Sequence, residues 1–328
     1  MHAYDFILGI DEAGLGPILG PLTVGYAAFQ LPAALKPDAL VNHDLWQVAG
    51  IGREPAERKK RPVVCDSKKL YTPAKGVSAL EEEVLAWAAA AGLDTSSWDA
   101  LHAGLCPLQR EKSSNYDWYS APPRPFPLEA GLDRSRLRAQ SIARLLDAAQ
   151  VKLRAFGVTP LLEGEFNRAI GRLESKSKAE FEVICRVIAD LWGRQRHMAV
   201  FCDRQGGRER YGHALHAEFP ECDITALFES PKLSTYELSI PSVEGQPRLF
   251  IAFAEKGESR TLPVALASMG AKYVREVMMQ QFNQWWAQHD GALKPTAGYY
   301  TDGKRWLQDT RNLRDAIGIP DNRIVRSR

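Results

Sequence analysis

The stretch that decides the fold runs from Phe6 to Pro17 and reads FILGIDEAGLGP. A short apolar run bounded by turn residues is typical of a buried strand. The run ends in Asp11 and Glu12, and a glycine-rich turn follows. A strand end at the rim of a sheet would hold two adjacent carboxylates rigidly, as a site for divalent metal ions requires. The alternative is a strand that ends in a solvated charged turn, and this segment alone leaves both open.

The composition is that of an ordinary globular protein. The chain has 328 residues, 45% hydrophobic and 25% charged, enough for two domains or for one domain with large insertions. Its formal net charge of +2 is too small to argue for nucleic-acid binding by itself. The five cysteines are odd in number and not closely paired, which favours reduced thiols in a cytoplasmic protein. No signal-peptide pattern and no apolar run near eighteen residues occurs, so we predict neither secretion nor membrane insertion.

Strand and helix patterns alternate along the chain. Apolar runs predict strands at 6–11, 22–29, 158–162 and 198–203, and strand character continues over 222–254. Helical periodicity or capping predicts helices at 73–91, from Ile142 to Leu153 with a stop at Gly157, from Phe181 to Leu191, at 262–289 and near 304–316. This alternation predicts an α/β sheet protein.

Two further acids have the placement of site residues. Asp203 follows a short apolar strand and precedes two glycines, as Asp11 does, and carboxyl ends of parallel strands meet at one edge of a sheet. Glu276 lies inside the long predicted helix, on one face with Ser268 and Lys272. The alternatives are a strand-end turn for Asp203 and a solvated Lys–Glu pair for Glu276.

Four motifs in order resemble the type 2 ribonucleases H, the ribonuclease HII and HIII family. Asp11–Gly16 with Gly20-Pro21 resembles the family's Asp-Glu-Ala-Gly-Arg-Gly and Gly-Pro, and 65–70 (CDSKKL) resembles its Asp-Ser-Lys-Lys-Leu. The stretches 256–258 (KGE) and 267–276 (ASMGAKYVRE) are similar to its Lys-Gly-Asp and Ala-Ser-x-x-Ala-Lys-x-x-Arg-Asp. Residues 298–301 (GYYT) resemble its Gly-Tyr-x-Thr.

The resemblance implies a ribonuclease H-like mixed sheet flanked by helices. It implies metal-dependent cleavage of the RNA strand of RNA–DNA hybrids, with 3′-hydroxyl and 5′-phosphate ends. Two Mg²⁺ or Mn²⁺ ions would be held by the acids that match the family's, which are Asp11, Glu12, Asp203 and Glu276. The residues that the resemblance places at the substrate are Gly14, Leu15, Gly16, Asp66, Ser67, Lys68 and Tyr299.

The chain departs from the family at two points. Leu15 stands where the family has an arginine in the loop that senses the ribose 2′-hydroxyl, and leucine supplies no guanidinium for a phosphate. The distance from Asp66 to Asp203 is longer than usual in the family, which predicts an inserted subdomain at about 94–165. We therefore expect a catalytic domain over 1–290 and a helical, basic, substrate-contacting segment over 291–328, whose tail carries Arg323, Arg326 and Arg328.

Other functions remain open from the sequence. Leu15 and the insertion leave room for a nuclease that cuts DNA or branched structures, and a non-catalytic hybrid-binding protein is a further alternative. Three arginines after Asp203 are candidates for phosphate contacts or for a solvated loop: Arg204, Arg208 and Arg210. His213 with His216 is read as a surface or packed pair rather than a metal site, and Trp285-Trp286 as packing rather than base stacking. Protein partners and the oligomeric state are not readable.

Overall fold

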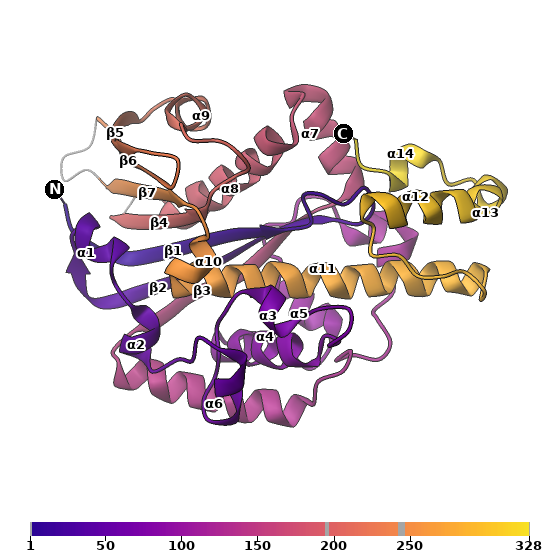
Figure 1. Cartoon of the computed structure of the whole chain (residues 1–328), viewed down its shortest axis with the longest axis horizontal. Helices are drawn as coiled ribbons and strands as arrows, with labels where there is room; N and C mark the ends of the chain where they lie inside the picture. The colour runs from indigo at the N-terminus through magenta and orange to yellow at the C-terminus, as the bar shows by residue number, and fades with distance from the viewer. Residues whose placement is uncertain (1, 194–196, 242–246, 328) are drawn as a thin grey trace.

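The computed structural model describes residues 2–193, 197–241 and 247–327. Its centre is a seven-stranded sheet in the order β3-β2-β1-β4-β7-β6-β5 (Figure 1). The strands β1, β4 and β7 are parallel neighbours, and the remaining pairs are antiparallel, so the predicted mixed sheet is confirmed. The strands are β1 Tyr4–Ala13, β2 Leu22–Leu35, β3 Lys152–Leu161, β4 Met198–Asp203, β5 Asp223–Glu229, β6 Leu233–Ser239 and β7 Arg248–Ala254.

Helices cover both faces of this sheet, as the sequence predicts (Figure 1). The shorter helices before β3 are α1 Pro37–Val41, α2 Leu45–Ala49, η1 Pro55–Lys59, α3 Ser67–Leu70, α5 Trp98–Leu105, η2 Ser113–Asn115 and η3 Asp117–Tyr119. The longer ones there are α4 Ser78–Ala90 and α6 Leu132–Ala148. After β3 come α7 Glu163–Leu173, α8 Lys176–Trp192, α9 Gly212–Glu218, α10 Gly257–Arg260, α11 Leu262–His289, α12 Tyr300–Asp309, α13 Arg311–Ile317 and α14 Asp321–Ile324.

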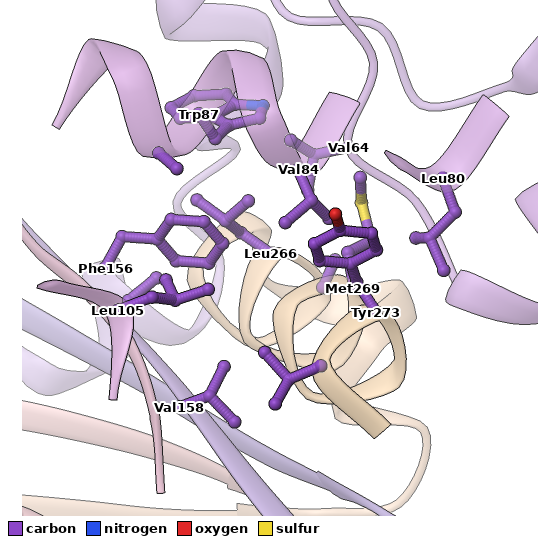
Figure 2. Packing of buried hydrophobic residues seen from close by; sticks show 14 of the residues in the cluster. Val64, Leu80, Val84, Trp87, Leu105, Phe156, Val158, Leu266, Met269 and Tyr273 are labelled. Carbon is purple, nitrogen blue, oxygen red and sulfur yellow. The ribbon is translucent and has the colours of Figure 1, made fainter. Parts of the chain in front are cut away.

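The larger core lies between the sheet and the helices α4, α6 and α11. Figure 2 shows Trp87 of α4 and Phe156 of β3 beside Leu266 and Met269 of α11, all of them fully or almost fully buried. Tyr273 of α11 also enters this core, where its hydroxyl donates to a carboxylate of α4 at 2.9 Å. The long helix α11 is therefore anchored between the sheet and α4, and this fixes the side chains that it presents near the end of β1.

A second core lies on the opposite face of the sheet, under α7, α8 and α9. Phe181 and Ile188 of α8 pack there on the central strands, and Tyr211 stacks on Phe253 of β7 with ring centroids 3.7 Å apart. This core holds the start of α8 beside the ends of β1 and β4.

Several predicted boundaries are wrong. The helix predicted from Ile142 ends at Ala148, because Leu153 and Gly157 lie in β3 instead. Gly157 is no helix stop: a side chain there would meet the ring of Tyr26 on β2 at 2.3 Å. The helix predicted near 304–316 is divided at Thr310 into α12 and α13, and the helix predicted from residue 73 begins at Ser78.

The predicted insertion at 94–165 is joined closely to the rest of the molecule. Its last strand, β3, pairs with β2 along the sheet, and Trp118 of η3 contacts the rings of Phe282 and Trp286 on α11. The ring of Trp306 on α12 lies 5.0 Å from the same two rings, which places the C-terminal helices at the far end of α11 (Figure 1). The domain boundaries themselves stay a prediction, and Arg328 lies outside the described residues.

No helix within the described ranges has both the length and the apolar character that crossing a membrane requires. All five cysteines are buried and none forms a disulfide.

Candidate active site

Asp11 and Asp203 come together because their strands are parallel neighbours. Ile10 of β1 is in register with Cys202 of β4, so the acid that follows each of them lies at the same edge of the sheet. Asp11 is 8% exposed, and the Asp203 carboxylate accepts a 2.7 Å hydrogen bond from the Gly257 backbone. Burial raises the pKa of Asp11 well above its ordinary value, and the charges of Glu12 and Asp203 raise it further. The structure thus brings together three of the four predicted acids.

The sequence analysis missed Glu180, which faces Glu12 from the second turn of α8. Glu180 is fully buried, and its carboxyl group lies within hydrogen-bonding reach of Glu12 and Gln205. Burial, together with the charges of Glu180 and Asp203, raises the pKa of Glu12 to about 8. The sequence did contain a hint of this role. Glu180 directly precedes Phe181, so the helical periodicity places its carboxylate next to the buried apolar face of α8.

Glu258 is a second acid that the sequence analysis did not select. It follows Gly257, whose backbone binds Asp203, and its side chain is partly buried. Burial raises the pKa of Glu258, and the charges of Asp203 and Asp66 contribute in the same direction. Glu258 belongs to the Lys-Gly-Glu motif of the family resemblance, but it was not among the acids predicted to hold metal. We call Asp11, Glu12, Glu180, Asp203 and Glu258 the acid group.

The structure does not bring Glu276 to the acid group. Its carboxylate accepts hydrogen bonds from the Tyr71 hydroxyl at 2.7 Å and from Lys272 Nζ at 2.6 Å. Ser268, eight residues earlier on α11, is the residue that reaches Asp11, and eight residues of helix span roughly 12 Å. Glu276 lies instead towards the glycine loop, because its neighbour Arg275 touches Gly14.

The segment before α3 supplies the polar surroundings of Asp11 and Asp203. Asp66 caps α3 by accepting from the Lys68 backbone at 2.9 Å. Ser67 is buried, and its hydroxyl lies 3.3 Å from that of Ser268, which in turn donates to the Asp11 carboxylate. The Lys68 side chain is exposed, and its charge favours the ionised form of Asp203. Within the described ranges Lys68 forms no ion pair and is a cation beside the acids, whereas Ser67 supports the position of Ser268.

The glycine loop, Gly14 to Pro17, is held from beneath by two buried arginines. Gly14 has a φ of +92°, and a side chain there would meet Arg275 Nε at 2.4 Å, so glycine is required. Arg326 donates to the Gly14 carbonyl at 2.6 Å and also to the carbonyl of Pro17. The carbonyls of Gly14 and Leu15, which Arg326 binds, face inward, so the amides of Leu15 and Gly16 in the same trans peptides face outward. The amide that follows the Pro17 carbonyl, that of Ile18, instead donates to the Gly298 carbonyl.

Tyr299 lies beside this loop. The backbone carbonyl of Gly298 accepts hydrogen bonds from Ile18 and Leu19, which fixes the following residue next to Pro17. The Tyr299 ring is 51% exposed and lies 5.7 Å from the guanidinium carbon of Arg275. The predicted substrate residues Gly14, Gly16 and Tyr299 therefore share one surface, and Leu15 turns partly towards the second core.

The donor chemistry of the acid group fits a hard divalent cation. All of its ligand atoms are carboxylate oxygens, and burial together with the neighbouring negative charges raises the pKa of Asp11 and Glu12. No three acid, histidine or cysteine side chains within the described ranges are arranged to coordinate a single ion. A bound dication would accordingly draw these side chains closer together.

The other predicted candidates have structural partners. Arg204 donates to the Pro231 carbonyl, Arg210 pairs with Glu229 at 3.6 Å, and Arg208 lies 5.1 Å above the Phe181 ring. Trp286 is fully buried, which agrees with its reading as packing.

No family model and no curated protein matches this chain. Solved structures do match it at low similarity. The ribonuclease H2 of Pyrococcus horikoshii OT3 is 16% identical, with a TM-score of 0.43 over 98% of this chain and 92% of that one. The ribonuclease HII of the PCNA complex from Archaeoglobus fulgidus is 14% identical, with a TM-score of 0.42 over 98% of this chain and 94% of that one. Bst-RNase HIII in complex with Mn²⁺ is 14% identical, with a TM-score of 0.45 over 98% of this chain and 65% of that one. These proteins are ribonucleases HII, H2 and HIII, and at this similarity they assign no activity to the chain.

Proposed function

We propose that this chain is a metal-dependent endonuclease that hydrolyses the RNA strand of RNA–DNA hybrids to 3′-hydroxyl and 5′-phosphate ends. The observation that carries the proposal is the convergence of Asp11 and Asp203 at one sheet edge, with Glu12 and Glu258 beside them. A protein that only binds nucleic acid needs basic side chains at such a site, whereas one that hydrolyses a phosphodiester needs acidic side chains that hold metal ions.

Asp11, Glu12, Asp203 and Glu258 would hold Mg²⁺ or Mn²⁺. Such ions neutralise charge on the phosphate and lower the pKa of a bound water. Glu258 takes the place that the resemblance gave to Glu276, because it lies near Asp203 whereas both oxygens of Glu276 are already paired. Glu180 adds a fifth carboxyl group behind Glu12, and bound cations would favour the ionised forms of all five.

The remaining residues would position the nucleic acid. The ammonium group of Lys68 beside Asp203 is placed to pair with a phosphate next to the cut. The outward amides of the glycine loop are suited to a ribose hydroxyl, and the exposed Tyr299 ring to stacking on the sugar. Leu15 adds no charge to this surface, so recognition of a single embedded ribonucleotide depends on the loop amides and Tyr299.

We further propose a cytoplasmic protein, in agreement with five buried cysteines that form no disulfide.

The test is a cleavage assay with Mg²⁺ or Mn²⁺ that compares wild type with Asp11→Asn. Three labelled duplexes are offered: RNA paired with DNA, DNA with one ribonucleotide, and DNA alone. We expect the wild type to cut the hybrid and the variant to leave it intact. Cutting of DNA alone would support a nuclease of altered specificity instead. Binding without cutting of any duplex would support a hybrid-binding protein.

A further inference from the structure

An arginine-rich pocket lies between α7 and α8, outside the acid group. It has a volume of about 180 Å³, and four arginines line it: Arg110, Arg168, Arg172 and Arg186. Ala179 also lines it, and the next residue along α8 is Glu180 of the acid group. The pocket therefore begins beside the candidate active site.

Arg186 is the innermost of these arginines. Its Nε and Nη2 atoms are buried and have no hydrogen-bond partner among the described residues, and Nη1 reaches Glu165 at only 3.4 Å. Burial lowers the pKa of Arg186, and the neighbouring charge of Arg110 lowers it further. Unpaired buried donors of a guanidinium are costly, and an oxyanion that accepts from both nitrogens would remove that cost.

Arg168 also lines a second, larger pocket, so the two pockets are neighbours. The larger pocket has a volume of about 560 Å³ and lies between α7, the segment around Tyr116 and the C-terminal residues Asn322 and Arg323. We call the two together the arginine groove. Five arginines line it, against three glutamates, Glu111, Glu165 and Glu182, so it has two more cations than anions.

The exposed arginines of the groove have only weak existing partners. Arg168 pairs with Glu111 at 3.2 Å and is 67% exposed, and Arg172 pairs with Glu182 at 2.6 Å and is 59% exposed. Exposed ion pairs of this kind contribute little free energy. A phosphate can therefore replace the glutamates as partner of these guanidinium groups with only a small loss of free energy.

We propose that the arginine groove binds the phosphate backbone of a nucleic-acid strand, with Arg186 donating to the innermost phosphate. The groove starts next to Glu180 and ends at the C-terminal segment, whose Arg326 holds the glycine loop. One strand can thus occupy both the groove and the candidate active site. This inference rests on the proposed function for the identity of the strand, but not for the binding itself.

The test is equilibrium binding of a labelled RNA–DNA hybrid to the Asp11→Asn protein without divalent metal, at several salt concentrations. The groove variant is Arg168→Gln/Arg172→Gln, whose exposed positions should leave folding intact. We expect it to bind about tenfold more weakly and to lower the slope of log K against log salt by about 2, as the loss of two phosphate contacts requires. Arg186→Gln should lower the slope by about 1.

The matched control is Arg134→Gln/Arg136→Gln on α6, across the sheet. These arginines are 79% and 59% exposed, and Arg136 pairs with Asp133 as Arg172 does with Glu182. The control should bind like the parent. An equal loss in the control, or no loss in the groove variant, would overturn the proposal.

Inorganic phosphate and pyrophosphate form a second arm. If millimolar concentrations of either bind wild type but not Arg186→Gln, while hybrid binding is the same in both, the groove is a site for a small anion and the proposal is wrong. If wild type fails to cut the hybrid but the groove variant still loses hybrid binding, the proposed function fails and the groove stands.

Discussion

Buried charged side chains form a network beneath the glycine loop, in addition to those of the acid group. In the network, the Tyr119 hydroxyl donates to Glu163 at 2.8 Å, and Arg326 lies close enough for its charge to act on the same carboxyl. Arg326 then binds the carbonyls of the loop. The predicted insertion, which contains Tyr119, is thereby linked through α7 to the loop that we propose meets the substrate.

Glu163 gives a prediction about pH. Burial raises its pKa from 4.5 to about 7, so the folded protein holds this proton more tightly than the unfolded chain does. The contribution of Glu163 to stability is therefore lost as the pH rises from about 4.5 to 7, on the order of 3 kcal/mol. In Glu163→Gln this loss is absent. We expect the free energy of unfolding of the variant, relative to wild type, to increase by that amount between pH 4.5 and 8 in urea titrations. A difference that does not change with pH would contradict the assignment.

At the scale of elements, α11 decides the geometry of the site because it lies unusually close to the sheet. A side chain on Gly25 of β2 would meet the Ala267 carbonyl of α11 at 2.0 Å, and one on Gly9 of β1 would meet the α11 backbone at 2.2 Å. The close approach sets Ser268 against Asp11 and Arg275 against Gly14.

Gly25→Ala should therefore push α11 off β2. We expect it to lower the free energy of unfolding by about 3 kcal/mol, because backbone rather than a flexible side chain must move. Gly171 in α7 is the control, since a side chain there meets no atom within 4 Å. Gly171→Ala should stabilise the protein by about 0.5–1 kcal/mol. Equal effects of the two substitutions in urea unfolding would contradict the close packing.

At the scale of the whole molecule, the acid group combines side chains from β1, β4, α8 and α10. Asp11 and Asp203 could be predicted together, because acids after short apolar strands converge wherever the strands are parallel neighbours. Glu180 and Glu258 could not, because their proximity depends on how α8 and α10 pack on the sheet. Glu276 was selected from a motif. The spacing of four already offered Lys272 as its partner, whereas the hydrogen bond from Tyr71 is seen only in the structure. Most strands and the bounds of α11 followed from periodicity, whereas the end of α6 did not, because the apolar residues of β3 continue its pattern.

The concentration of like charge predicts that metal ions stabilise the whole fold. Mg²⁺ at about a hundred times its Kd should add about 2.7 kcal/mol to the free energy of unfolding, seen as a rise of several degrees in Tm. NaCl of equal ionic strength is the control for screening. Asp11→Asn should be more stable than wild type without metal, because it relieves repulsion, and should gain less from Mg²⁺. Identical gains in the variant and in wild type would show that the ions bind elsewhere.

The role of Glu258 is tested most directly by the kcat for hybrid cleavage. The variants Glu258→Gln and Glu276→Gln are each compared with wild type at saturating substrate. The central claim is that Glu258 joins Asp11, Glu12 and Asp203 in holding the metal ions. It predicts a fall on the order of a hundredfold or more for Glu258→Gln, because a metal ligand is lost. For Glu276→Gln it predicts a kcat close to that of wild type, with any effect confined to KM. A large loss of kcat in Glu276→Gln, together with near-normal kcat in Glu258→Gln, would contradict it.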